Sequence, residues 1–251
     1  SGIIAADIVA KSQPDGYTLL MAGGSFGTIS ILYPQAPDTA KDFAPVALFG
    51  TSPYLFVVHP GVPVKTMTEF IDYARARPGQ LTFAGSTPAA VQRLSGELLK
   101  RMTGIDMLYV PYKGTGPALT AILAGEAQAM VAALPGAIPF VKEKRLRALA
   151  LTSAKRALAM PDLPTVQETG IAGYDVTSWN GQLAPAGMPA EIVRRFNSEF
   201  NRIITTPEMR KRMIENGYEP MGGSPERFGE HIRSEIAKWA PVVKSANIRV
   251  D

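Results

Sequence analysis

Residues 81–88 read LTFAGSTP, and this stretch contains the local pattern that decides the fold. Leu81–Ala84 is apolar enough for a buried strand, and residues 85–87 are small or hydroxylated. Pro88 suits the first turn of a helix, which we expect to continue to about Thr103. A strand, a tight connection and a helix therefore follow one another directly.

The same pattern recurs further along the chain. Tyr109 and Val110 end a strand that residues 113–116 connect to a helix, which Pro117 opens and Gly125 closes. A strand at 127–133, a short helix at 135–144 and a strand at 146–152 come next. Strands that alternate with helices predict a mostly parallel sheet with both faces covered.

The flanking segments extend this α/β pattern. A helix at 2–11 and a turn at 13–16 precede an apolar strand at 17–21, and the residues after that strand are rich in glycine. Strands are also predicted at 44–49, 53–59 and 174–183, and helices at 67–77, 190–205, 207–216 and 225–246.

Composition argues against several classes of function. The 251 residues carry a net charge of +4 from scattered Lys and Arg, and only 8% are aromatic, so nucleic-acid binding is not indicated. The chain has no cysteine, which removes disulfides, thiolate nucleophiles and sulfur metal ligands. No apolar run approaches the roughly 20 residues that a membrane-spanning helix needs.

Three connections combine small or hydroxylated residues with the start of a helix, at residues 22–28, 85–91 and 112–116. In an open parallel sheet such connections lie at the carboxyl ends of the strands, where ligands bind. Glycine lets a ligand approach the backbone, and the exposed N–H groups of a helix N-terminus favour an anion. The alternative is that these are only tight turns in which Ser or Thr caps a helix.

Catalytic groups are scarce. His59 and His231 are the only histidines, so neither a metal site nor a partner for the hydroxyl of Ser25 or Ser86 is apparent. Lys113 either pairs with a ligand carboxylate or lies solvated at a turn. None of the glycine-rich segments has the spacing of a phosphate-binding loop.

Several ordered motifs resemble those of the Bug-type receptors of tripartite tricarboxylate transporters. The resemblance runs nearly from end to end, and it rests on residues 14–20 (PDGYTLL), 42–46 (DFAPV), 110–114 (VPYKG), 146–153 (LRALALTS), 163–165 (LPT), 179–181 (WNG) and 184–187 (APAG).

The resemblance implies a bilobal α/β Venus-flytrap fold, like that of type II periplasmic binding proteins, with two hinge strands. Lobe one would be residues 1–56 and 180–251, and lobe two residues 57–179. Trp179, near one hinge, either packs in the core or walls the cleft.

A periplasmic, non-catalytic receptor is implied, without cofactor or metal, which delivers a small organic carboxylate or amino acid to membrane permease subunits. The ligand-binding residues implied in its interlobe cleft are Gly24, Ser25, Phe26, Thr28, Ser86, Thr87, Ala89, Ala90, Tyr112, Lys113, Gly114, Thr115 and Ala133.

Two departures from the family pattern leave alternatives open. The family begins with a strand and a loop rich in proline and glycine, whereas this sequence begins in what resembles the following helix, so we expect about one βα unit to be absent. In the family a histidine usually follows the second connection, whereas residues 85–92 of this chain read GSTPAAVQ and contain no histidine. The alternative functions are an α/β enzyme acting on small carboxylates and an effector-sensing domain of a regulator. An exposed sheet edge could also pair with another chain, so an oligomer is a further possibility.

Overall fold

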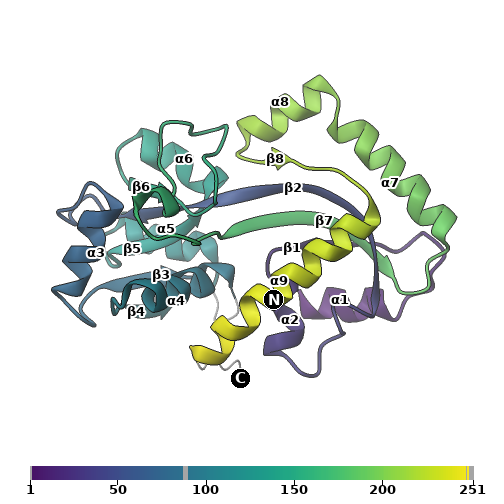
Figure 1. The fold of residues 1–251 in the computed structure, drawn as a ribbon, viewed down its shortest axis with the longest axis horizontal. Coiled ribbons are helices and arrows are strands. Elements are labelled where there is room, and N and C mark those ends of the chain that lie inside the picture. The colour runs from purple at the N-terminus through teal and green to yellow at the C-terminus, as the bar shows by residue number, and fades with distance from the viewer. Residues whose placement is uncertain (1, 87–89, 247, 249–251) are drawn as a thin grey trace. The chain divides into compact units, whose positions relative to one another are not determined.

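The computed structural model describes residues 2–86, 90–246 and 248, and the chain divides into two compact units. Unit 1 consists of the residues up to Thr51 and those from Ser178 onward, and unit 2 consists of Ser52–Thr177. The chain passes between the units within β2 (Phe43–Val58) and at the start of β7 (Thr177–Pro185), which can be followed in Figure 1. The lobe boundaries at residues 56 and 180 stay a prediction.

The sheet of unit 2 places three parallel strands beside one another. The second part of β2 is followed by β5 (Ala129–Ala133), β3 (Thr82–Gly85) and β4 (Leu108–Pro111), and β6 (Arg147–Leu151) pairs with the other edge of β2. β3 is parallel to β4 and β5, whereas β2 is antiparallel to β5 and β6. Since β5 and β6 are both antiparallel to β2, the strands β3, β4, β5 and β6 all run in one direction, and only β2 of these five runs in the other. The expectation of a mostly parallel sheet is therefore confirmed for unit 2.

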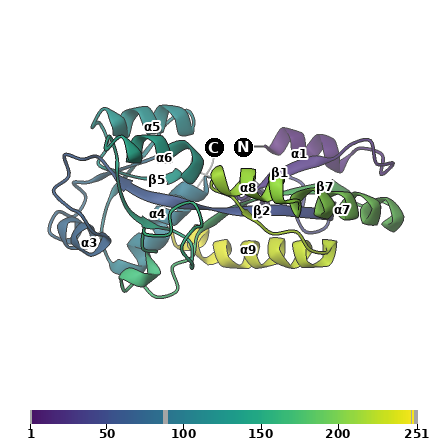
Figure 2. The same ribbon diagram turned by 90° about the horizontal axis from the view of Figure 1, so that it is seen from above.

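Helices cover both faces of these strands. Leu55 and Val57 of β2 pack in one cluster with residues of α5 (Thr115–Leu123) and α6 (Leu134–Lys142). Phe56, between them, points the other way and contacts Phe70 of α3 (Met67–Arg75), with ring centroids 4.8 Å apart. Figure 2 shows α5 and α6 on one side of the strands of unit 2, and α3 and α4 (Val91–Thr103) on the other.

Unit 1 has an antiparallel sheet. β1 (Leu20–Gly23) pairs with β7, and the first part of β2 pairs with β8 (Glu219–Pro220). Trp179 is fully buried and packs edge-to-face against Phe26 and Phe228. The helices of this unit are α1 (Ile3–Ala10), α2 (Phe26–Leu32), α7 (Ala190–Ile204), α8 (Pro207–Glu215) and α9 (Pro225–Ser245), of which α2 packs on α9.

Several predicted boundaries moved once tertiary contacts were present. The strands expected at 44–49 and 53–59 form the single strand β2. Pro53 has no N–H to donate, but it does not interrupt the strand, because the ladder with β8 ends at Thr51 and the ladder with β5 starts at Tyr54. β7 begins at Thr177 rather than 174, and α4 begins at Val91. β8 and a 3₁₀ helix at Gln167–Thr169 were not predicted.

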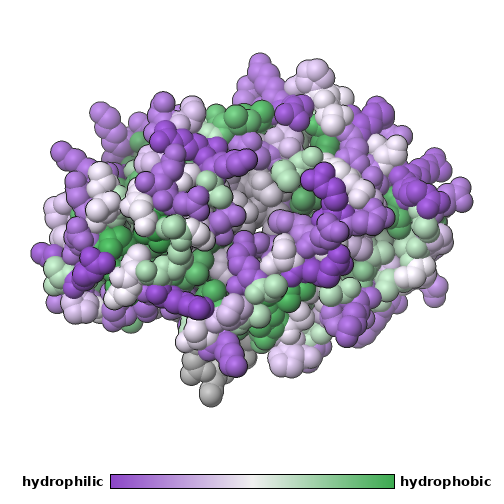
Figure 3. Space-filling view, viewed as in Figure 1, coloured by the Kyte–Doolittle hydropathy of each residue, from purple (hydrophilic) through white to green (hydrophobic). Residues whose placement is uncertain are grey.

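No helix among the described residues is both long and apolar enough to cross a bilayer. On the face shown in Figure 3, hydrophilic side chains predominate and hydrophobic ones lie in separate areas.

Candidate functional site

The carboxyl ends of the three parallel strands of unit 2 bring the predicted segments together. Gly85 at the end of β3 is in register with Pro111 at the end of β4, and the N–H of Tyr112 donates to the carbonyl of Gly85 at 2.8 Å. β5 runs in the same direction as β3 and ends at Ala133. The connections to α4, α5 and α6 therefore all leave from one edge of the sheet, which we call the unit 2 edge (Figure 1).

The helices that start at the unit 2 edge have open N-termini. α4, α5 and α6 have neither a side chain that caps the first turn nor an acidic residue in it. α3, in the same unit, has both: Thr66 accepts from the N–H of Glu69 at 3.1 Å, and Glu69 supplies the negative charge. The first-turn N–H groups and the positive dipole ends at the edge thus lack a negative side chain.

The connection between β4 and α5 carries four of the predicted residues. Tyr112 is partly buried and packs against the core beside α5, whereas Lys113 and Thr115 are exposed. Gly114 adopts φ 124° and ψ 171°, a backbone conformation that favours glycine, and it forms the N-cap of α5.

The other predicted residues of unit 2 lie at the ends of the two remaining connections. Ser86 is partly exposed directly after β3, and Ala90, only 8% exposed, is the N-cap of α4. Ala133 is partly exposed and is the N-cap of α6. Thr87 and Ala89 lie outside the described residues.

The predicted residues of unit 1 surround the start of α2. Ser25 is exposed and is the N-cap, whereas Gly24 is buried. The side chain of Phe26 is 3% exposed and packs in the core, and the buried hydroxyl of Thr28 donates to the carbonyl of Ser25 at 2.8 Å. These two side chains therefore serve the local structure of unit 1, and the exposed polar group of the segment is the hydroxyl of Ser25.

The sequence did not predict the packing of Gly85, Tyr109 and Arg93 at the unit 2 edge. The ring of Tyr109 lies over Gly85, where an added Cβ would be 2.5 Å from Cε2 and 2.6 Å from Oη of the tyrosine. The guanidinium of Arg93 stacks on the same ring, 4.8 Å from its centroid. Burial raises the pKa of Tyr109 to about 12, although the positive charge of Arg93 acts to lower it. No local signal indicates this contact, because its members come from β3, β4 and α4.

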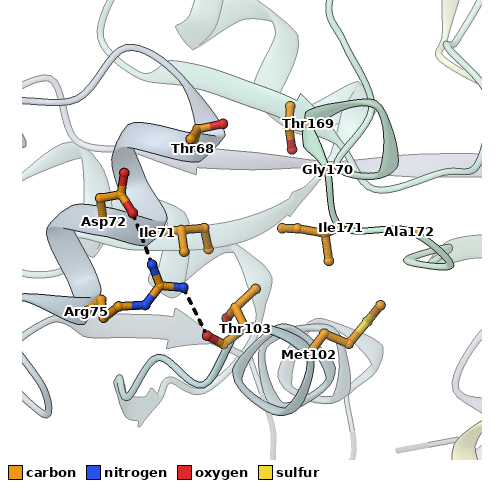
Figure 4. Close-up of a pocket in the computed structure, with 10 residues that line it drawn as sticks. All are labelled: Thr68, Ile71, Asp72, Arg75, Met102, Thr103, Thr169, Gly170, Ile171 and Ala172. Atoms are coloured by element: carbon orange, nitrogen blue, oxygen red, sulfur yellow. Dashed lines mark hydrogen bonds and ion pairs between the residues drawn. The ribbon is translucent and has the colours of Figure 1, made fainter.

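A pocket of about 380 Å³ lies elsewhere in unit 2, between α3, the end of α4 and residues 169–172 (Figure 4). Its charged groups satisfy one another, since Arg75 donates to Asp72 at 3.1 Å and to the carbonyl of Thr103 at 3.3 Å. None of the predicted ligand-binding residues lines this pocket.

Catalytic and metal constellations are not found in the described part of the chain. No group of three His, Cys, Asp or Glu residues could hold a metal ion there. The Nδ1 of His59 accepts from the N–H of Gly61 at 3.1 Å, and His231 packs edge-to-face on Trp179. No hydrogen bond among the described residues joins Ser25 or Ser86 to a histidine.

The fold matches that of solved periplasmic binding proteins. Rpa4515 of R. palustris, solved with adipate, superposes with a TM-score of 0.90 at 37% identity, over 99% of this chain and 84% of that one. MatC (Rpa3494) of Rhodopseudomonas palustris, solved with malate, gives 0.84 at 32% identity over 96% and 84%. Periplasmic binding protein BugD gives 0.86 at 28% identity over 99% and 84%. The predicted fold class is thereby confirmed.

Sequence comparison identifies the family. The model of the tripartite tricarboxylate transporter family receptor matches residues 1–248, and this chain belongs to that family. Protein BugT of Bordetella pertussis is 30% identical over 99% of this chain and 77% of its own length. A UPF0065 protein from the tcbD-tcbE intergenic region of Pseudomonas sp. (strain P51) is 33% identical over 96% and 73%. The resemblance seen in the sequence motifs is therefore confirmed.

Proposed function

We propose that this protein is a periplasmic receptor that captures a small organic carboxylate and delivers it to the membrane permease subunits of a tripartite tricarboxylate-type transporter. The observation that carries the proposal is the unit 2 edge, where α4, α5 and α6 begin without a capping side chain or a first-turn acid. Such N-termini bind anions through their N–H groups and the helix dipole.

The N–H and hydroxyl groups described at the unit 2 edge are suited to hydrogen-bonding a carboxylate rather than to catalysis. A carboxylate oxygen accepts from first-turn N–H groups, while the hydroxyls of Ser86 and Thr115 supply further hydrogen bonds. An amino acid offers the same carboxylate and stays the second ligand class. No described hydrogen bond joins Ser25 or Ser86 to a histidine that could act as a base, so no specific observation favours an enzyme. No specific observation favours a regulatory domain either.

The relatives support the ligand class. The solved structures of Rpa4515 and MatC contain adipate and malate, and both are carboxylates. We propose that the segment Gly24–Thr28 of unit 1 also takes part in ligand binding, with Ser25 as its exposed polar group.

A thermal-shift screen against mono-, di- and tricarboxylates and amino acids tests the proposal, because a ligand that binds only the folded state raises the Tm. We expect a saturable shift with at least one carboxylate, and mass spectrometry should recover that ligand unchanged. Conversion of the ligand would favour an enzyme instead. A panel in which no carboxylate or amino acid shifts the Tm contradicts the receptor proposal.

A further inference from the structure

Lys144, in the turn that ends α6, has a backbone conformation that lysine rarely adopts. Its φ is 59°, and in the part of the chain that the structure describes it is the one residue other than glycine with a positive φ. The N–H of the next residue, Arg145, donates to the carbonyl of Phe140 at 2.9 Å and closes the turn. Glycine is the usual residue at such a position, because a Cβ is strained there. The protein therefore keeps an exposed lysine where glycine would relieve the strain.

A pocket of about 310 Å³ lies beside this turn in unit 2, and we call it the α6–β6 pocket. Four of its six lining residues are apolar, and the six are Pro60, Val141, Lys144, Leu146, Arg147 and Ala148. The Nη1 of Arg147 donates to the carbonyls of Val62 at 2.9 Å and Val64 at 2.8 Å. The guanidinium is thus held in place beside the pocket, and the pocket combines an apolar wall with two cations.

The segment around the pocket has an excess of positive charge. Positions 142–147 hold two lysines, two arginines and one acid, Glu143. Glu143 pairs with Arg145 at 3.6 Å, whereas Lys142, Lys144 and Arg147 form no ion pair with any residue that the structure describes. Three positive charges close together in sequence therefore attract an anionic partner.

One edge of β6 is open at residues that also line the pocket. Arg147 and Ala148 pair with β2 on one side of the strand. On the other side, the described hydrogen bonds of β6 begin at Leu151, whose N–H donates to the carbonyl of Pro164 at 2.8 Å. Within the described ranges, no strand pairs with that second edge at Arg147 and Ala148. Such an edge can accept an extended peptide through main-chain hydrogen bonds.

We propose that the α6–β6 pocket and the open edge of β6 dock an extended acidic segment of another protein. The segment adds a strand to β6, places an apolar side chain in the pocket and pairs its carboxylates with Lys144 and its neighbouring cations. An anionic lipid headgroup would use the charge but not the strand edge, so a peptide fits more of the surface. This surface lies at the carboxyl end of α6, whereas the unit 2 edge lies at its amino end, and docking does not compete with the proposed ligand (Figure 1).

The test measures, by fluorescence anisotropy, how the full chain binds a labelled peptide of alternating glutamate and valine, about eight residues long like an ordinary strand. The wild type should bind it saturably. Lys144→Gly should weaken binding by about three- to fivefold, as for the loss of an exposed ion pair, while its Tm does not fall, because glycine relieves the strain. The control is Lys155→Gln, which removes an exposed lysine of the same unit from an unstrained backbone and should keep the wild-type affinity.

Two N-methylated forms of the peptide test the strand pairing separately from the charge. One is methylated at the glutamate amides and the other at the valine amides, and only one of these sets of N–H groups can face β6. One form should therefore lose binding and the other should keep it. Equal binding of both forms, full affinity in Lys144→Gly, or no saturable binding by the wild type would overturn the proposal. Vesicles of phosphatidylcholine and phosphatidylglycerol are the last probe, and vesicle binding that Lys144→Gly weakens, without peptide binding, would assign the surface to a membrane instead.

Discussion

At the scale of single residues, the unit 2 edge depends on the absence of a side chain at Gly85. An added Cβ would lie 2.5 Å from the Tyr109 ring, so Gly85→Ala forces that ring to move. We expect a loss of about 1–3 kcal/mol in the free energy of unfolding, as for other overpacked positions. Urea denaturation measures it, with Gly136→Ala as the control, since a Cβ at Gly136 meets nothing within 4 Å. Equal midpoints for Gly85→Ala and wild type would contradict the contact.

The buried hydroxyl of Thr152 links segments that are distant in sequence. It accepts from the N–H of Tyr54 at 2.9 Å and donates to the carbonyl of Val176 at 2.6 Å. Thr152→Val keeps the shape but removes both bonds inside a site with 0% exposure, so we expect a cost of about 1–3 kcal/mol in the free energy of unfolding. Thr68→Val, at an exposed position on α3, is the control and should stay within about 0.5 kcal/mol. A loss no larger than that of the control would show that the bonds add nothing.

At the scale of elements, α6 begins without a capping side chain or a first-turn acid, and under the proposed function its N-terminus is open to the ligand anion. Ala133 has the extended backbone of an N-cap, with φ −60° and ψ 129°. Ala133→Asp should cap the N–H of Gly136 and stabilise the protein by about 0.5–2 kcal/mol. Under the proposed function the new carboxylate competes with the ligand anion for the N-terminus of α6, so carboxylate affinity should fall by at least about tenfold.

The control for this change is Ala133→Ser, which caps the same helix without a charge. It should raise the Tm and reduce affinity less than the aspartate does. Calorimetry and thermal unfolding of both variants give the two quantities. Unchanged affinity in Ala133→Asp would place the ligand away from α6.

At the scale of the whole molecule, both tryptophans lie in unit 1, at positions 179 and 239. Trp179 packs edge-to-face on Phe26, with ring centroids 6.4 Å apart, and Phe26 belongs to the segment Gly24–Thr28. If that segment takes part in binding, titration with ligand should change the fluorescence emission of Trp179 in the Trp239→Phe variant. The ligand concentration at the midpoint of this change should equal the concentration at the midpoint of the calorimetric titration. Heat without any change in emission would indicate a site confined to unit 2.

Sequence alone was sufficient for the features that depend on neighbouring residues. The turn at 113–116, the α/β alternation and the family motifs are local patterns, and they located Lys113 and Ala133 close to helix starts and Ser86 directly after β3. The placement of these residues on one edge followed from the general rule for parallel strands, which β3, β4 and β5 obey.

Tertiary structure decided what depends on contacts between distant residues. The continuity and direction of β2, the burial of Phe26 and the stack of Arg93 on Tyr109 leave no local pattern. Tyr54 and Thr152 are 98 positions apart, yet they share a hydrogen bond. Such contacts are set by how whole elements pack and satisfy buried polar groups, and short-range periodicity does not encode that packing.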